Sequence, residues 1–181
     1  EKEGELWFEV DEQTLRRSQM EVKKATGAAP TSIMDLFPAP TSQTHSSEAG
    51  KYVAMDCEMV GVGPDGVESA LARVSLVNYH GGVLLDTYVK PVGRITDYRT
   101  HVSGVEPHHL RDAPSLQDVQ QRVFDLLQGK VLVGHGLKND FRALLLEHPR
   151  RMVRDTSKYR PFRRISRGKT PGLKRLVKHF L

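Results

Sequence analysis

Two carboxylates, Asp56 and Glu58, stand in a run of residues that otherwise has the character of a buried strand. Carboxylates are uncommon in strands because removing a charge from water is costly unless another group compensates for it. Side chains two positions apart on a strand point to the same face, with Cα atoms about 6.5–7 Å apart. The pair can therefore converge on one divalent cation, and its oxygen ligands suit Mg²⁺ or Mn²⁺ better than zinc. The alternative is an edge strand that carries two solvated acids.

A third carboxylate, Asp140, follows a second buried strand, which ends at Gly134. The glycine-rich turn places Asp140 in the first turn of a helix, where an acid is favourable for the helix dipole alone. If the second strand lies parallel to the first, however, Asp140 approaches Asp56 and Glu58. Three carboxylates around one point cannot all stay ionised without a cation. Together they predict a two-metal phosphoryl-transfer site, with Asp56, Glu58 and Asp140 as catalytic and metal-binding residues.

The elements that must position these acids follow from hydrophobic periodicity and turn signals. Strands separated by short glycine turns, at 52–59, about 70–79 and 83–90, predict an antiparallel meander. A long loop with a short helix near 106–111 follows. The later elements are a helix from Ser115 to Gly129, a strand at 130–134, a helix at 139–147, a strand at 153–156 and a final helix from Pro171. This order predicts an α/β fold with a mixed sheet.

The 181 residues divide by composition into an arm and a domain. Residues 1–50 are acidic overall and end in a Pro-, Ser- and Thr-rich stretch, so we expect a flexible arm there and a domain at 51–181. The arm holds the apolar cluster Leu6-Trp7-Phe8, which either packs back on the domain or docks on a partner. Because the chain begins with Glu rather than Met, we expect it to be a piece of a longer protein.

Composition also excludes several classes of protein. A single cysteine rules out a disulfide framework and offers no thiolate pair for zinc, so we expect an intracellular location. No apolar run approaches the length of a membrane span, and the first residues are acidic, so we expect neither a signal peptide nor a membrane partner.

The last part of the chain is strongly basic. Residues 150–181 hold 12 Lys and Arg side chains against Asp155 alone, interleaved with Tyr159 and Phe162. Such a stretch can neutralise phosphates and stack on bases, which favours contact with nucleic acid. A solvated helix face and a nuclear-import signal are the alternatives.

Five segments of the sequence resemble the DEDDh 3′–5′ exonucleases, and within that family the eukaryotic RNA exonucleases. The segments span 54–64, 71–78, 96–104, 133–140 and 154–159. The resemblance covers 51–181 and implies an RNase H-like, three-layer exonuclease fold. It further implies two Mg²⁺ or Mn²⁺ ions at the acids, Met59 and Arg99 against the terminal nucleotide and its phosphate, and release of nucleoside 5′-monophosphates from RNA 3′ ends.

The arm adds a resemblance of its own. Its segment Leu6-Trp-Phe-x-Val-Asp is similar to the segment before the domain in a ribosome-biogenesis member of the RNA exonuclease branch. The resemblance implies RNA as a partner, pre-rRNA in particular, and contact with proteins of the pre-ribosomal particle through the arm. It also implies a nuclear and nucleolar location.

One family motif has no match before Leu181. It is a His followed five residues later by an Asp on the next helix, which supply the general base and a metal ligand. We therefore expect the C-terminal part of the domain to be missing from this chain, and the chain alone to be inactive. The competing interpretation is a binding or scaffold module that uses the fold on pre-ribosomal RNA without cleaving it.

Overall fold

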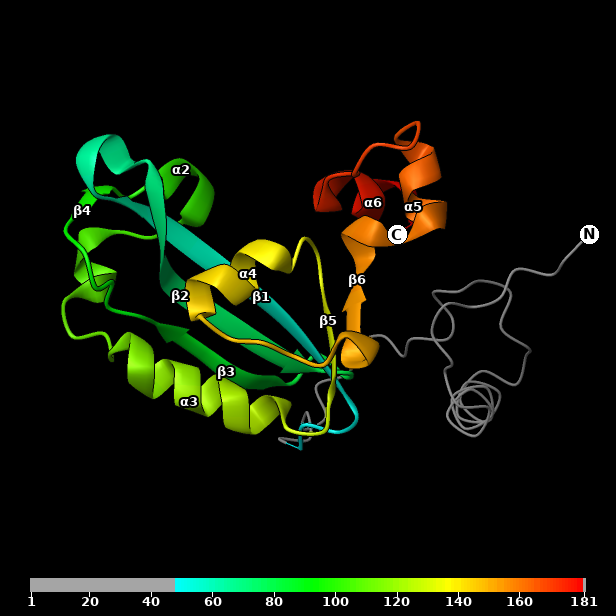
Figure 1. The fold of residues 1–181 in the computed structure, drawn as a ribbon, viewed down its shortest axis with the longest axis horizontal. Helices are drawn as coiled ribbons and strands as arrows, with labels where there is room; N and C mark the ends of the chain where they lie inside the picture. The colour runs from blue at the N-terminus through cyan, green and yellow to red at the C-terminus, as the bar shows by residue number, and fades with distance from the viewer. Residues whose placement is uncertain (1–47, 181) are drawn as a thin grey trace, which may run out of the picture. The chain divides into compact units, whose positions relative to one another are not determined.

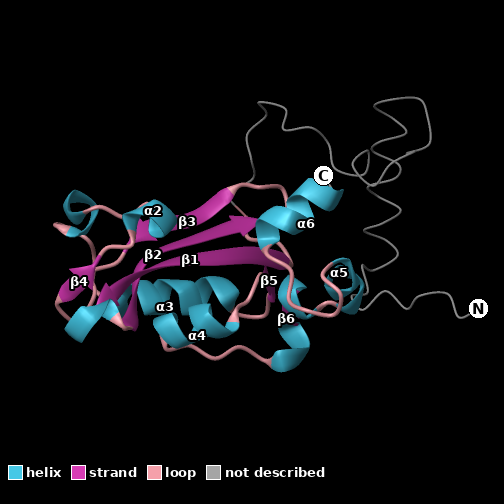
Figure 2. Cartoon of the chain, turned by 90° about the horizontal axis from the view of Figure 1, so that it is seen from above, coloured by secondary structure: helices cyan, strands magenta, loops and turns pink. Residues whose placement is uncertain are grey.

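A computed structural model describes residues 48–180, which are built around a mixed sheet (Figures 1 and 2). The strand order is β3-β2-β1-β5-β6, and β4 pairs with β1 outside this path. The strands are β1 Tyr52–Val62, β2 Glu68–Asn78, β3 Val83–Tyr88, β4 Ile95–Asp97, β5 Val131–Gly134 and β6 Val153–Asp155. The first three form the expected antiparallel meander, while β5 and β6 add parallel strands beside β1.

Five helices and several single turns connect the strands in this part of the chain. The helices are α2 Thr100–Ser103, α3 Leu116–Leu127, α4 Lys138–Leu144, α5 Arg160–Ile165 and α6 Leu173–Phe180. The 3-10 turns are η2 Pro64–Gly66, η3 Pro107–Leu110, η4 Arg150–Met152 and η5 Thr156–Lys158. In Figure 2, α3 and α4 lie on one side of the sheet and α2 on the other. Helix α3 begins as expected at Ser115, whose hydroxyl accepts a hydrogen bond from the Asp118 amide at 3.2 Å.

The main hydrophobic core lies between the sheet and the helices α3 and α4. From β1 it takes Val53, Met55 and Cys57, whose side chains alternate with those of Asp56 and Glu58. From the helices it takes apolar residues at helical spacing, namely Val119, Val123, Leu127, Leu137 and Leu144. The alternation therefore places the acids on the opposite face of β1 from the core, as the sequence predicts.

Several element bounds differ from the sequence predictions. The loop after residue 90 holds a further strand, β4, and the helix α2, because β1 continues to Val62 and offers β4 two pairing positions. The helix predicted at 139–147 ends at Leu144, since Leu145 takes a left-handed conformation (φ 51°) and its amide donates to the Arg142 carbonyl. The last helix begins at Leu173 rather than at Pro171, which is buried just before it.

Candidate active site

The two strand acids lie at a gap in the pairing of β1, on one of the two edges of that strand. Along one edge, β1 pairs with β2; along the other, β5 pairs only with 52–54, and β4 only with Gly61 and Val62. In the described part of the chain, residues 55–60 thus have no strand partner on that second edge. Asp56 and Glu58 stand within this gap, and we call it the edge gap. A short stretch of β1 is therefore left for groups other than a neighbouring strand.

The third acid enters the edge gap because β5 stops short. A Cβ atom on Gly134 would lie 3.0 Å from the Met55 carbonyl oxygen, so glycine allows β5 to end directly against β1. The chain then turns at Gly136 (φ 78°), whose positive φ favours glycine, and α4 begins two residues later. Asp140 lies in the first turn of α4 and is only 6% exposed. The sequence spacing thus delivers a buried carboxylate beside β1.

Electrostatics couples the three carboxylates. Burial raises the pKa of Glu58, the Asp56 and Asp140 charges raise it further, and Arg73 opposes them. Burial also raises the pKa of Asp140, with Asp56 adding to it, while hydrogen bonds from Cys57 partly offset the rise. Burial and a hydrogen bond to Asp140 raise the pKa of the Cys57 thiol, so the thiol stays protonated. The edge gap therefore concentrates negative charge that a cation would relieve.

The chemistry of these donors fits a hard divalent cation, because all three are carboxylate oxygens. The positions of these carboxylates, however, do not form a complete metal-binding group. Within residues 48–180, no group of three or more His, Cys, Asp and Glu side chains is placed to hold a metal ion. The described residues thus supply the carboxylates and their charge, but not a closed set of three ligands.

The two residues predicted to contact the terminal nucleotide occupy different surroundings. Met59 follows a register shift between β1 and β2 and packs, partly buried, against the main core. Arg99 has a left-handed backbone (φ 50°), and its guanidinium donates to the Ser69 hydroxyl at 2.8 Å and the Gly66 carbonyl at 2.7 Å. Arg99 therefore fastens the start of α2 to the β1–β2 hairpin. Its contact with a phosphate stays a prediction.

Two further residues support the site, although the sequence analysis did not name them as site residues. Arg73 lies opposite Glu58 on β2 and donates to both carboxylate oxygens of Asp86, at 2.8 and 2.7 Å. Asp155, at the end of β6, is 4% exposed and accepts from the Gly136 amide at 2.9 Å. It thereby fixes the turn that leads into α4. The signal for Asp155 that the sequence offers is its place as an acid at the end of a strand parallel to β5.

His135 and Asp140 have the spacing of the His and Asp motif that the family resemblance implies, but the contacts of His135 are not those of a general base. The His135 ring nitrogen Nδ1 lies 2.9 Å from the Thr156 hydroxyl, which in turn donates to the Gly134 carbonyl at 3.0 Å. His135 thus belongs to the junction between β5 and β6.

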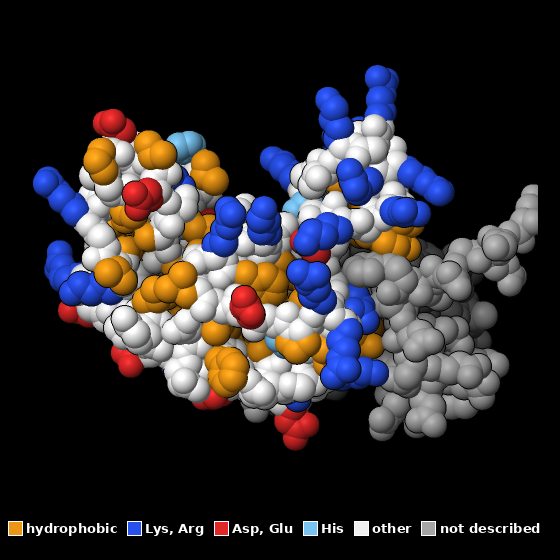
Figure 3. Space-filling view, in the orientation of Figure 1, with side chains coloured by type: hydrophobic (Ala, Val, Ile, Leu, Met, Phe, Trp, Pro, Cys, Tyr) orange, Lys and Arg blue, Asp and Glu red, His pale blue; other side chains and the backbone are white. Residues whose placement is uncertain are grey.

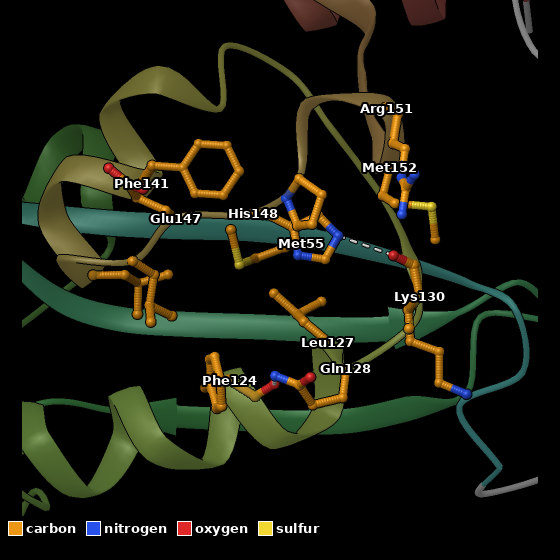
Figure 4. Close-up of a pocket in the computed structure, with 14 residues that line it drawn as sticks. Met55, Phe124, Leu127, Gln128, Lys130, Phe141, Glu147, His148, Arg151 and Met152 are labelled. Carbon is orange, nitrogen blue, oxygen red and sulfur yellow. Dashed lines mark hydrogen bonds between the residues drawn. The ribbon is translucent and has the colours of Figure 1, made fainter.

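A cavity of about 340 Å³ lies on the core side of β1 (Figure 4). Met55 reaches it from β1, Phe124 from α3 and Phe141 from α4. At its rim the His148 ring nitrogen Nε2 lies 2.9 Å from the Lys130 carbonyl oxygen. Because Met55 points away from the face that carries Asp56, the cavity is separate from the acidic site.

The Lys and Arg side chains of the basic segment 150–179 fall into two groups. Figure 3 shows Lys and Arg side chains around α5 and α6. Some hold the local backbone: Arg163 donates to the Gly168 carbonyl at 3.1 and 2.8 Å, and Arg175 to the Ile165 carbonyl at 2.9 Å. Others, such as Arg164, are exposed and make no side-chain hydrogen bond or ion pair within the described residues. Sequence charge alone did not separate these two groups.

These observations define an α/β domain with acids at a gap in its central strand. Residues 53–180 match the exonuclease family RNase_T, and the chain belongs to this family. The RNase H-like exonuclease fold expected from the sequence is thereby confirmed.

Two individual relatives show which exonucleases this chain is similar to. The chain is 55% identical to RNA exonuclease 4 of Kluyveromyces lactis over 144 residues, which cover 79% of this chain and 49% of that protein. It is 53% identical to RNA exonuclease 4 of Debaryomyces hansenii over 154 residues, covering 85% and 56%. The chain thus spans about half the length of these relatives. The resemblance to RNA exonucleases is confirmed.

A solved structure of an RNA exonuclease module is also similar to this chain. The Saccharomyces cerevisiae Pan2 pseudoubiquitin hydrolase–RNA exonuclease module in complex with A7 RNA superposes with a TM-score of 0.54 at 31% identity. The match covers 65% of this chain and 22% of that chain.

Among residues 48–180, no helix combines the length and apolar character that crossing a membrane requires.

Proposed function

We propose that this chain carries the acidic site of a divalent-metal-dependent 3′–5′ exoribonuclease that shortens RNA from its 3′ end. The observation that carries the proposal is the edge gap, where Asp56, Glu58 and Asp140 share one electrostatic environment. An acidic cluster is costly for stability, so a fold that only binds RNA has no need of it. The family and the names of the relatives support RNA as the substrate class.

In this proposal Asp56, Glu58 and Asp140 hold two ions, Mg²⁺ or Mn²⁺. Such ions, when bound, neutralise charge on the scissile phosphate and activate a water for attack. Asp56 and Glu58 fix the position of the RNA 3′ end relative to β1, and Met59 and Arg99 contact the terminal nucleotide and its phosphate. The products are nucleoside 5′-monophosphates.

We further propose that the 181-residue chain by itself cleaves little or no RNA. The described residues do not close a three-ligand set, and His135, which has the motif's spacing to Asp140, contacts the Thr156 hydroxyl. Loss of a general base alone costs about 10²–10⁴-fold in rate. The same observation favours a second candidate function for the chain on its own, namely binding of pre-ribosomal RNA without cleavage.

Product analysis tests the proposal. RNA labelled at either end is incubated with the 181-residue chain and with a version of the protein that also holds the third family motif, with and without Mg²⁺. The longer version should release labelled mononucleotide only from the 3′-labelled RNA and only with Mg²⁺, while the chain alone should be nearly inactive. Mononucleotides from the 5′ end, or internal cuts, would contradict the proposed direction. Binding without cleavage in both versions would favour the second candidate.

The cellular role is a further part of the proposal. We propose pre-rRNA as the substrate, the nucleolus as the location and the arm at residues 1–50 as the docking segment for pre-ribosomal proteins. The support is the Leu6-Trp7-Phe8 cluster in an acidic, linker-like segment, since a tethered apolar anchor raises local concentration without altering chemistry. These residues lie outside the described part of the chain. Deleting 1–47, which keeps the Glu48 carbonyl bonded to Asn78 and Ala49 packed on the core, should reduce association with pre-ribosomal particles and leave RNA affinity and the unfolding temperature nearly unchanged. A lower unfolding temperature with intact association would instead assign the arm a structural role.

A further inference from the structure

A row of planar side chains crosses the sheet from the acidic site to its far edge. On β2, Arg73 lies directly opposite Glu58, and on β3, Tyr88 lies directly opposite Arg73. Residues directly opposite each other in antiparallel strands share a face of the sheet. Arg73 and Tyr88 therefore stand on the same face as Asp56 and Glu58, and not on the face that the main core covers.

The row continues beyond the sheet into the turn η3. The Arg73 guanidinium carbon lies 5.8 Å from the centre of the Tyr88 ring, and the His109 ring stacks on Tyr88 at 4.3 Å with 13° between the planes. His108 follows, with ring centres 4.0 Å apart and a tilt of 54°. We call Arg73, Tyr88, His109 and His108 the planar ladder. The His108 side chain is 63% exposed, so the ladder ends in a ring that solvent reaches.

Neighbouring groups hold the planar ladder in place. Asp86 binds the Arg73 guanidinium through both oxygens at one end of the ladder. At the other end, the Glu106 amide donates to His109 Nδ1 at 3.1 Å, and the Glu106 carboxylate lies 3.3 Å from His108 Nδ1. Fixed ring positions reduce the entropy that a stacking partner must lose on binding.

We propose that the planar ladder is a stacking site for an unpaired nucleobase of the RNA strand, upstream of the 3′ end held at the acids. Aromatic and imidazole faces accept any base, because every base has a π-face. The two carboxylates beside the ladder, Asp86 and Glu106, disfavour a phosphate at this place and can accept hydrogen bonds from base amino groups. The site therefore takes a base and not the backbone. This inference rests on the proposed function, since it assumes RNA at the acids.

Geometry sets which nucleotides reach the ladder. Two strand spacings separate Glu58 from Tyr88, about 10 Å, and two further rings extend the path to His108. A dinucleotide at the acids is too short to reach His108, whereas a strand of about ten nucleotides can do so. The ladder thus predicts a contribution to affinity that depends on RNA length.

Fluorescence anisotropy with the 181-residue chain in EDTA tests this inference, because no cleavage interferes. Removal of the ring in His108→Ala should weaken binding of a single-stranded RNA of about ten nucleotides by about 5- to 100-fold. The same variant should bind a dinucleotide like the unmodified chain. His108→Tyr, which keeps a ring, should restore most of the affinity. His101→Ala is the matched control, since His101 is exposed on the neighbouring α2 and lies outside the ladder.

An RNA in which the upstream nucleotides lack their bases separates base stacking from backbone contact. With this probe, His108→Ala and the unmodified chain should bind equally. If His108→Ala binds the normal RNA as tightly as the unmodified chain does, or loses affinity equally for both probes, the stacking site is refuted while the proposed function stands. If the unmodified chain binds no single-stranded RNA of any length, the proposed function itself fails.

Discussion

The edge gap and the basic segment are both charged, yet they are built in opposite ways. The acids of the edge gap are held by strand register and by burial, with Asp140 only 6% exposed. The cations of the basic segment stand on short helices, and several of them donate hydrogen bonds to backbone carbonyl groups of the same segment. Charge in the first region is preorganised by the fold. In the second region, charge partly creates the fold.

This difference indicates what a substitution should do in each region. A substitution in the edge gap removes a group whose position the whole sheet determines, so its chemical effect is large and its structural effect small. A substitution in the basic segment has a chemical or a structural effect depending on which carbonyl its guanidinium contacts. The following predictions test that division.

The largest effect is expected at Asp56. In a version of the protein that cleaves RNA, Asp56→Asn should lower the rate by at least about 100-fold, since even residues behind a metal ligand contribute about 10–100-fold. RNA affinity without metal should change by a few-fold at most, or rise, because a charge that repels phosphate is lost. Cleavage and binding assays on the same preparation measure both. Asp125→Asn on α3 is the control, and retained cleavage in Asp56→Asn would remove Asp56 from the metal site.

A structural effect is expected where β5 meets β1. Gly134→Ala should lower stability by about 1–3 kcal/mol, because the new Cβ lies against the Met55 carbonyl and the buried Leu137 side chain. Thermal unfolding measures it. Gly172→Ala is the matched control, since open space surrounds Gly172 and its backbone is not left-handed. Equal unfolding temperatures for the two variants would show that β5 can move away from β1 without cost.

Asp155 links the two regions, and its effect should depend on pH. Burial raises the pKa of Asp155, but hydrogen bonds from Ser157, the Gly136 amide and Lys158 outweigh this and leave the pKa below its ordinary value. The ionised form is thus favoured in the folded state. Its stabilisation is present above the ordinary aspartate pKa of about 3.9 and is lost as pH falls through the lowered folded value.

Asp155→Ala should therefore destabilise the chain by about 1–3 kcal/mol at pH 7, because buried donors lose their acceptor. The difference in unfolding temperature from the unmodified chain should shrink toward pH 3. Asp112→Asn, an exposed acid, is the control. A difference that stays constant between pH 7 and pH 3 would assign the effect to packing alone.

The smallest effect is expected in the basic segment, where Arg163 and Arg164 form a matched pair. If Arg164 contacts a phosphate, Arg164→Glu should flatten the salt dependence of single-stranded RNA binding by about 0.7 in log–log slope and leave the unfolding temperature unchanged. Arg163→Glu should also lower the unfolding temperature, because its bonds to the Gly168 carbonyl are lost. An unchanged slope in Arg164→Glu would exclude this side chain from the RNA contact.

Much of the fold could be predicted because its signals are local. The alternation around Asp56 gave the face of the acids, and the helical spacing of Val119 and Val123 gave α3. The pairing of β4 with Gly61 and Val62 could not be predicted, since it is three residues long and joins distant segments. The left-handed conformation of Leu145 has no sequence signal either, because leucine seldom adopts it.

The sequence indicates the three acids as candidate site residues, but it does not indicate the residues that support them. Asp56, Glu58 and Asp140 have unusual types for their positions, so the sequence exposes them. The supports use ordinary residue types. Nothing in the sequence shows that Arg99 binds the Gly66 carbonyl, or that Asp155 accepts from Gly136. Such contacts depend on tertiary geometry, and sequence periodicity does not encode it.

The edge gap has a consequence for solubility. An unpaired strand edge is a template on which another chain can add a strand, and so start aggregation. In the edge gap, the Cys57 amide donates to the Asp140 carboxylate, and the charges of Asp56 and Glu58 border the same stretch. The acids therefore keep the central strand of the sheet from pairing with a second molecule.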